Sequence, residues 1–376
     1  MKILAQTDAL NVSLVKAYTG IPEATAWCDR IRGLSPCFIC GFAFTETALI
    51  PGISAAGASP LARRFTALAD AEVLLQGFSP RLPTSPDGYP SPVVISRAIL
   101  SQLDWSTYLF DCGLPESLTG LIRVSEQSGS RCLSTGQAMD RSTVQHLFQQ
   151  GKEWGQALAS RDSYCVIGEC VAGGTTTALA VLLGLGWSVA GMVNSSHPIC
   201  NHEQKWALVQ EGLRHLPPQA DPWQVLAAVG DPMQAFVAGF ALQASQHNPV
   251  LLAGGTQMLA VVAIMQRLAR DMDISWQPQN MVVGTTRWVA EDPTGQTVRL
   301  AELLGEVPLL ATQLSFASSR FAPLQAYERG YVKEGVGAGG LSLAASLSAG
   351  WQQEDLLTAI EGVYEQWLSY GRSRDP

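Results

Sequence analysis

Residues 164–183 are YCVIGECVAGGTTTALAVLL, and this stretch predicts a buried strand, a glycine-rich turn and a helix in that order. Backbone N–H groups at the start of a helix lack intrahelical acceptors and lie at the positive end of the helix dipole. Glycines let a ligand approach the backbone, and threonine hydroxyls add donors. The turn therefore predicts an anion site, and its predicted binding residues are Gly168, Gly173, Gly174, Thr175 and Thr176.

This turn differs from two common phosphate loops. No lysine follows the glycines as in a Walker loop, and the G-x-G-x-x-G spacing is missing. Glu169 would repel a phosphate, so we expect its carboxyl group to face a hydroxyl group or a cationic ring. An ordinary strand-to-helix turn, with glycines for packing only, stays open as an alternative.

The composition indicates a compact protein with a large core. Of 376 residues, 47% are hydrophobic and 15% are charged, the opposite of the balance found in disordered chains. The 24 basic and 32 acidic residues give a net charge of -8, which argues against a nucleic-acid partner. Eight cysteines, several of them inside apolar runs, indicate buried thiols in a reducing compartment. We therefore expect a cytoplasmic protein.

No segment predicts export or membrane insertion. Lys2 and Asp8 interrupt the start of the chain before the apolar region of a signal peptide could form. The longest apolar run, residues 178–193, contains 16 residues and three glycines, whereas a membrane span needs roughly 20 apolar residues. We expect this run to form a helix, a tight turn and a strand.

Alternating apolar strands and helical stretches predict an α/β fold with a doubly wound, mostly parallel, Rossmann-like sheet. The predicted strands are residues 37–44, 164–168, 188–193, 250–252 and 280–283. The predicted helices are residues 142–159, 231–246 and the amphipathic tail 354–371, whereas four prolines exclude a long helix in 77–92. We expect a large nucleotide-binding domain over 31–320 and a small helical domain formed by 1–30 and 321–376.

Glycine-rich turns follow two further segments. One contains Gly254 and Gly255, and the other runs from Glu334 to Gly340. Because ligands of open α/β sheets bind at the carboxyl ends of the strands, we expect three converging turns to hold a ligand the size of a nucleotide. A partly desolvated Glu334 could serve as a general base. Close helix packing at Gly254-Gly255 and a capping or solvated Glu334 are the structural alternatives.

Two of these motifs resemble those of the nicotinate-nucleotide:dimethylbenzimidazole phosphoribosyltransferase family. Its Gly-Glu-x-x-x-Gly-Asn-Thr-Thr motif is similar to residues 168–176, GECVAGGTT, and its Gly-Glu-Gly-x-Gly-Ala catalytic loop is similar to residues 333–338, KEGVGA. Weaker similarities lie at residues 51–54, 135–139, 230–239 and 250–255. The chain is most similar to the divergent archaeal and cyanobacterial branch of this family.

The resemblance implies transfer of the 5-phosphoribosyl group from nicotinate mononucleotide to an aromatic base. The product would be an α-ribotide for the lower ligand of a cobamide, and the reaction needs neither a metal nor a cofactor. Glu334 would take the proton of the attacking base nitrogen, and Glu169 would stabilise the positive ribosyl centre. Lys205 corresponds to a family lysine that would contact the phosphate or carboxylate of the nucleotide, with a plain surface lysine as the alternative.

Five further binding residues are predicted: Gly254, Gly255, Gly335 and Gly337 from the converging glycine turns, and Ser54 from the segment 51–54 that resembles the family. The family also implies a homodimer. Two family acidic positions are altered, at residues 230–234, GDPMQ, and 253–255, AGG. Residues 284–288, GTTRW, replace a family His-x-Ser-x-Glu pattern. The identity of the base therefore stays open between benzimidazole, adenine and a phenol-like acceptor.

Other readings of the sequence are weaker. Cys37 and Cys40 have the C-x-x-C spacing of a redox or zinc site but lie in an apolar strand without a second pair. His197, Cys200 and His202 could offer metal ligands, although we expect a polar loop there. A dinucleotide oxidoreductase would need the missing G-x-G-x-x-G motif. Because two acidic positions of the family are altered, a second class of function stays open: a nucleotide-binding regulator or inactive partner subunit.

Overall fold

The computed structural model describes residues 14–159 and 163–372. In this part of the chain, eight strands form one sheet in the order β1-β8-β7-β6-β5-β2-β3-β4. All neighbouring pairs are parallel except β1 and β8, which are antiparallel. The strands are Val15–Ala17 (β1), Pro36–Ala43 (β2), Thr107–Gly113 (β3), Ile122–Arg123 (β4), Tyr164–Cys170 (β5), Val250–Ala253 (β6), Met281–Thr286 (β7) and Leu309–Thr312 (β8).

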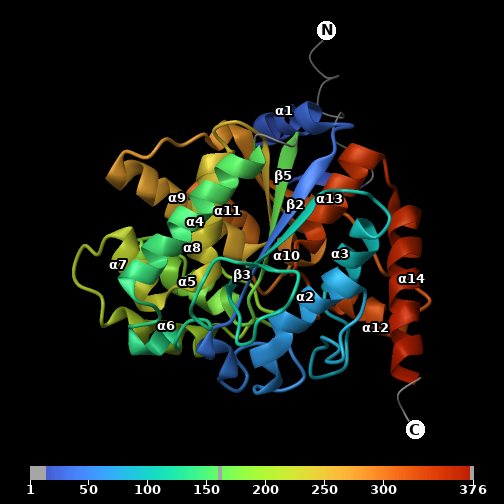
Figure 1. Cartoon of the computed structure of the whole chain (residues 1–376), viewed down its shortest axis with the longest axis horizontal. Helices are drawn as coiled ribbons and strands as arrows, with labels where there is room; N and C mark the ends of the chain where they lie inside the picture. Colours follow the sequence, from blue (N-terminus) through green and yellow to red (C-terminus); the bar gives the residue numbers. More distant parts are fainter. Residues whose placement is uncertain (1–13, 160–162, 373–376) are drawn as a thin grey trace.

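Helices cover both faces of this sheet, as Figure 1 shows. They are Ile21–Ile31 (α1), Thr66–Gln76 (α2), Val93–Leu100 (α3), Arg141–Ala159 (α4), Gly174–Gly184 (α5), His202–Leu213 (α6), Pro222–Val229 (α7), Pro232–Ala244 (α8), Thr256–Met272 (α9), Arg287–Ala290 (α10), Thr297–Leu304 (α11), Ala322–Gln325 (α12), Ala338–Ala349 (α13) and Gln353–Arg372 (α14). α8 contacts β2, β3, β5 and β6, whereas α13 contacts β5 to β8. The predicted doubly wound α/β class is confirmed.

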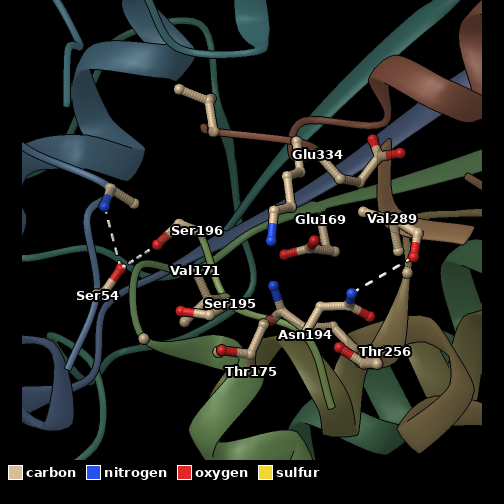
Figure 2. Close-up of a pocket in the computed structure, with 17 residues that line it drawn as sticks. Ser54, Glu169, Val171, Thr175, Asn194, Ser195, Ser196, Thr256, Val289 and Glu334 are labelled. Carbon is tan, nitrogen blue, oxygen red and sulfur yellow. Dashed lines mark hydrogen bonds between the residues drawn. The ribbon is translucent and has the colours of Figure 1, made fainter. Parts of the chain in front are cut away.

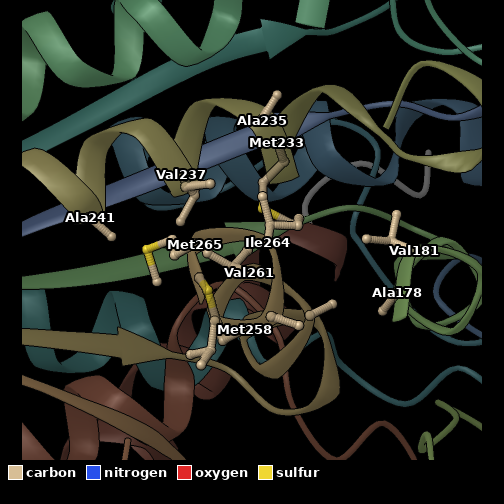
Figure 3. Close-up of a cluster of buried hydrophobic side chains, with 14 of the residues drawn as sticks. Ala178, Val181, Met233, Ala235, Val237, Ala241, Met258, Val261, Ile264 and Met265 are labelled. Atoms are coloured by element: carbon tan, nitrogen blue, oxygen red, sulfur yellow. The ribbon is translucent and has the colours of Figure 1, made fainter. Parts of the chain in front are cut away.

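Each face of the sheet has its own hydrophobic core. Consecutive strand residues point to opposite faces, so Cys37 and Ile39 of β2 join one core and Phe38 and Cys40 join the other. Figure 3 shows part of the first core, where residues of α5, α8 and α9 pack together. Burial on both faces explains why the central strands are unbroken apolar runs.

Most predicted elements are present, and one is wrong. β2, β5, β6 and β7 correspond to four predicted strands, with ends shifted by a few residues. Residues 188–193 form irregular structure and a turn instead of a strand. β5 already pairs with β2 on one side and β6 on the other, so no place beside it is free. The sequence also did not predict β1, β3, β4 and β8.

The predicted helices are also present, as α4, α8 and α14, and residues 77–92 contain no long helix. The two ends of the described chain both reach the main body of the fold. β1 pairs with β8, while α14 packs against α3. The division into domains 31–320 and 1–30 plus 321–376 stays a prediction.

The expected lack of an export signal concerns residues 1–8, which lie outside the described residues. Among residues 14–159 and 163–372, no helix is both long enough and apolar enough to cross a membrane.

Candidate active site

The candidate site lies at the carboxyl ends of the central strands. Parallel strands place these ends at one edge of the sheet, where the turns after β5 and β6 meet the loop before α13. The cavity there encloses about 540 Å³, part of it open to solvent. It is lined by Ser54, Ala56, Glu169, Val171, Gly173, Gly174, Thr175, Asn194, Ser195, Ser196, Gly255, Thr256, Gln257, Val289, Val332, Lys333 and Glu334. Figure 2 shows these residues converging from separate elements.

The glycine turn after β5 forms the part of the cavity wall at which α5 begins. Gly173 has a φ of 81°, a left-handed conformation that favours glycine. Gly173, Gly174 and Thr175 line the cavity, whereas Thr176 is buried beneath them. The turn thus presents the N-terminus of α5, with its backbone donors, to the same space as Glu169 and Glu334.

Glu334 is held by donors on both oxygens. Its Oε1 accepts from the backbone N–H groups of Gly335 at 3.1 Å and Gly339 at 3.0 Å. Its Oε2 accepts from the Thr285 hydroxyl at 3.0 Å and the Thr286 N–H at 2.9 Å. The four donors fix the carboxyl group in one orientation at the cavity wall. Burial nevertheless raises the pKa of Glu334 to about 7, although these hydrogen bonds lower it.

The loop that carries Glu334 has a strained backbone. Val332, Lys333 and Val336 have φ values of 67°, 68° and 56°, a region that residues other than glycine rarely adopt. Strained residues of this kind cluster at functional sites because the surrounding structure must hold them there. The strain indicates that the position of Glu334 depends on its neighbours.

Glu169 is the second carboxyl group of the cavity. Its side chain is 3% exposed, and its Oε2 has no hydrogen-bond partner among the described residues. Burial is the main reason that the pKa of Glu169 rises to about 8, and the negative charges of Glu334 and Asp231 raise it further. Hydrogen bonds from the Val171 backbone and the Gln257 side chain oppose this rise. Two carboxyl groups in one cavity therefore titrate close to neutral pH.

The two lysines that could serve the site have different positions. Lys205 is fully buried, and its Nζ donates to the backbone oxygen of Asn194, a residue of the cavity wall. Lys205 itself lies outside the set of residues that line the cavity. Lys333 does line the cavity, and its Nζ pairs with Asp292 at 2.5 Å. The structure thus places Lys205 behind the wall, so its contact with a nucleotide stays a prediction.

Some of the predicted glycines line the cavity, and others lie behind its wall. Gly255 lines it, whereas Gly254 packs beside Glu169. Gly335 lines an adjoining cavity. Gly168 and Gly337 touch each other, because a Cβ on Gly168 would lie 3.2 Å from the Gly337 backbone. This close approach lets the Glu334 loop reach the end of β5, so Gly168 and Gly337 shape the site rather than line it.

Ser54 joins the site from the segment that follows β2. Its hydroxyl lies 3.2 Å from that of Ser196, which in turn accepts from the Ala55 N–H at 2.8 Å. Both serines line the cavity, on the side away from Thr256 in Figure 2. The predicted residue Ser54 therefore lies in the cavity wall with a serine that the sequence did not single out.

The structure shows where residues of two segments that differ from the family motifs, 230–234 and 284–288, are located. Asp231, in the altered 230–234 segment, is fully buried, caps α8 through the Gln234 N–H and accepts from the Thr177 hydroxyl at 2.5 Å. Thr285 and Thr286, in the altered 284–288 segment, hold the carboxyl group of Glu334. Both segments therefore contact elements of the site: Asp231 bonds to Thr177 of α5, and the two threonines bond to Glu334. The sequence could have indicated these two threonines as site residues, because they follow the predicted strand 280–283 and ligands bind at the carboxyl ends of such strands.

The other sequence motifs do not form a metal site. Cys37 and Cys40 point into cores on opposite faces of β2. A His197 ring nitrogen lies 3.0 Å from the Gly52 backbone oxygen, whereas a His202 ring nitrogen lies 2.6 Å from that of Thr294. Within the described ranges, no group of three or more His, Cys, Asp or Glu side chains is arranged to hold a metal ion.

Comparisons with known proteins show which family model and which solved structures this chain resembles. A family model described as phosphoribosyltransferase matches residues 96–280. The structure of CobT from Thermus thermophilus covers 90% of this chain and 88% of its own, with a TM-score of 0.61 and 19% identity. A nicotinate-nucleotide-dimethylbenzimidazole phosphoribosyltransferase structure from the same organism covers 91% and 87%, with a TM-score of 0.58 and 20% identity. At these identities the two structures show a shared fold.

The chain thus has the fold of these two structures and matches a phosphoribosyltransferase family model over part of its length, so the predicted family resemblance is confirmed. Curated relatives are much closer in sequence. A UPF0284 protein of Gloeobacter violaceus is 57% identical over 91% of this chain and 91% of its own length. One from Cyanothece is 54% identical over 94% and 98%, respectively. The chain belongs to the UPF0284 family, in its cyanobacterial branch.

Proposed function

We propose that this protein transfers the 5-phosphoribosyl group of nicotinate mononucleotide to the nitrogen of an aromatic base. The single observation that carries the proposal is the position of Glu334. It is fixed by four donors, titrates near neutral pH and shares one cavity with Glu169 and the start of α5. The product is an α-ribotide, the precursor of a cobamide lower ligand.

The phosphate of the nucleotide lies at the start of α5 in this proposal. Backbone N–H groups of the turn at Gly173 and Gly174 and the hydroxyl of Thr175 donate to the phosphate oxygens. Lys333 also lines this cavity, with its Nζ paired to Asp292. This arrangement leaves the ribose between the turn and the two carboxyl groups.

The transfer forms one carbon–nitrogen bond and breaks another. The base nitrogen attacks the anomeric carbon, and its proton passes to the Glu334 carboxylate. The bond between that carbon and the pyridine nitrogen breaks, and nicotinate leaves with the bond's electron pair. Glu169 stabilises the positive charge that develops on the ribosyl centre. The pyridinium charge of the bound nucleotide favours the ionised form of Glu169, because a nearby positive charge lowers a carboxyl pKa.

Nicotinate release measures this reaction directly. The wild-type protein is mixed with nicotinate mononucleotide and a panel of bases, and Glu334→Gln serves as the matched variant because Gln has nearly the same shape. We expect release with at least one base, and a loss of about 10²-fold or more in Glu334→Gln, the range of a general base. Nucleotide affinity should stay unchanged, because the phosphate contacts lie at the other end of the cavity.

The alternative class, a nucleotide-binding regulator or inactive partner subunit, gives a different result. Such a protein would bind nicotinate mononucleotide and release no nicotinate with any base of the panel. That outcome would contradict the transferase proposal.

A further inference from the structure

A second cavity adjoins the one that holds the glycine turn. The two share seven lining residues, including Glu169 and Glu334, and the second has a volume of about 560 Å³, part of it open to solvent. Pro83, Pro92 and Val336 contribute apolar surface to it. Apolar walls next to a general base suit a planar aromatic ring. If the proposed function holds, this second cavity receives the acceptor base.

Asp70 of α2 is a polar group in this otherwise mostly apolar space. Its side chain is 2% exposed and lines the second cavity. Its Oδ2 accepts from the Cys170 thiol at 3.1 Å, and Ser91 lies close enough to lower the pKa of the carboxyl group. Its Oδ1 is buried and has no partner anywhere in the described part of the chain.

A buried oxygen without a partner is costly, since it has lost its hydrogen bonds to water. No ion pair within residues 14–159 and 163–372 involves Asp70, so no cation compensates its burial. Burial also raises the pKa of Asp70 to about 7, and a donor at Oδ1 would favour its ionised form, in which both oxygens accept. A ligand group that bonds to Oδ1 would remove the cost of the open position.

We infer that Asp70 determines acceptor specificity, and that the acceptor ring carries a hydroxyl or amino group which donates a hydrogen bond to Asp70 Oδ1. A methyl group at the same place would leave this oxygen unpaired. A site built for a hydrogen bond binds the analogue that lacks it more weakly, because its buried oxygen is then left unpaired. In this role Asp70 selects the base, and Glu334 remains the group that takes the proton.

The experiment compares two bases of nearly equal shape, 5-aminobenzimidazole and 5-methylbenzimidazole. Their affinities for the full-length protein are measured by titration calorimetry, which detects binding whether or not transfer follows. We expect the wild type to bind the amino compound about tenfold more tightly, the effect of one hydrogen bond. In Asp70→Leu the ratio should fall to about one, with the affinity for the methyl compound retained. Asp70→Asn, which keeps an acceptor oxygen, should restore part of the ratio.

Equal wild-type affinities for the two compounds, or an unchanged ratio in Asp70→Leu, would overturn the inference. The wild-type ratio needs no variant, so a folding defect in Asp70→Leu leaves the test intact. Nicotinate release is followed in parallel with both bases. A tenfold binding preference without any release would support the role of Asp70 in binding and count against the transferase proposal, so the two failures are distinguishable.

Discussion

At the scale of single residues, the site depends on two carboxyl groups whose protonation changes near neutral pH. Glu334 has a pKa of about 7 and Glu169 a pKa of about 8, chiefly because both are buried. Since the two groups interact, these values describe the titration of the pair. Glu334 must be ionised to accept a proton, and Glu169 must be ionised to stabilise a positive centre.

The pH dependence of transfer follows from these two requirements. We expect kcat/KM to rise with pH between about 6 and 8 and to level off above the higher pKa. Below about pH 7 the slope of log kcat/KM against pH should approach two, since two protons must leave the free protein. In Glu169→Gln the slope should fall to about one, because only Glu334 still titrates. An unchanged slope in that variant would show that Glu169 need not ionise.

The pKa of Asp70 predicts how stability changes with pH. Its folded-state pKa of about 7 exceeds the roughly 3.9 of an unfolded aspartate, so its contribution to stability is complete below about pH 4 and is lost as the pH rises to about 7. Between about pH 5 and 8 the wild type should lose about 2 to 3 kcal/mol more unfolding free energy than Asp70→Asn. Urea denaturation at both pH values measures this, with the exposed Asp104→Asn as the control. Equal losses in wild type and Asp70→Asn would disprove the coupling.

At the scale of elements, the start of α13 and the end of β7 together hold Glu334, the proposed general base, in place. The Gly339 N–H donates to Glu334, and a Cβ on Gly339 would lie 2.2 Å from the Thr285 backbone carbon and 2.5 Å from Glu334 Oε2. A backbone atom cannot move aside as a flexible side chain can. The contact between these two elements therefore requires glycine at this position.

Gly339→Ala should displace the Glu334 loop. We expect transfer to fall by about 10²-fold, since a shift of about 1 Å in a catalytic group has an effect of that size. Gly362→Ala is the matched control, because a Cβ there meets no atom within 4 Å and α14 gains a better helix former. Nicotinate release measures both variants. Full activity in Gly339→Ala would mean that the base is not positioned by this contact.

At the scale of the whole molecule, segments from the two ends of the described chain share one core. Trp27 of α1, Val93 of α3 and Ile360 of α14 belong to the same buried cluster. β1 also extends the main sheet by pairing with β8. The described residues at the two ends of the chain thus pack against the rest of the molecule through a common core.

Thermal unfolding tests this packing. Because the segments share a core, we expect one cooperative transition in calorimetry, with equal calorimetric and van't Hoff enthalpies. Two separate transitions would show that residues 1–30 with 321–376 unfold independently of residues 31–320. The proposed homodimer is checked in the same samples by sedimentation equilibrium.

Local sequence patterns predicted the α/β class and most central elements. Apolar runs such as 164–168 form strands wherever both faces are buried, so they could be recognised without knowledge of their neighbours. The run 188–193 looked the same but lacks a strand partner, since β5 is already paired on both sides. Short strands such as β1 and β8 carry too few residues for a clear pattern.

The sequence by itself determined the glycine turn after β5, the candidate base Glu334 and the family that these motifs resemble, because these depend on residues close together in the chain. Only the tertiary structure decided what surrounds them. It brought Thr285 and Thr286 to Glu334, placed Lys205 behind Asn194 and left Asp70 with an open oxygen in the second cavity. These contacts join residues far apart in sequence, and burial, which sets their pKa values, exists only once the chain has folded.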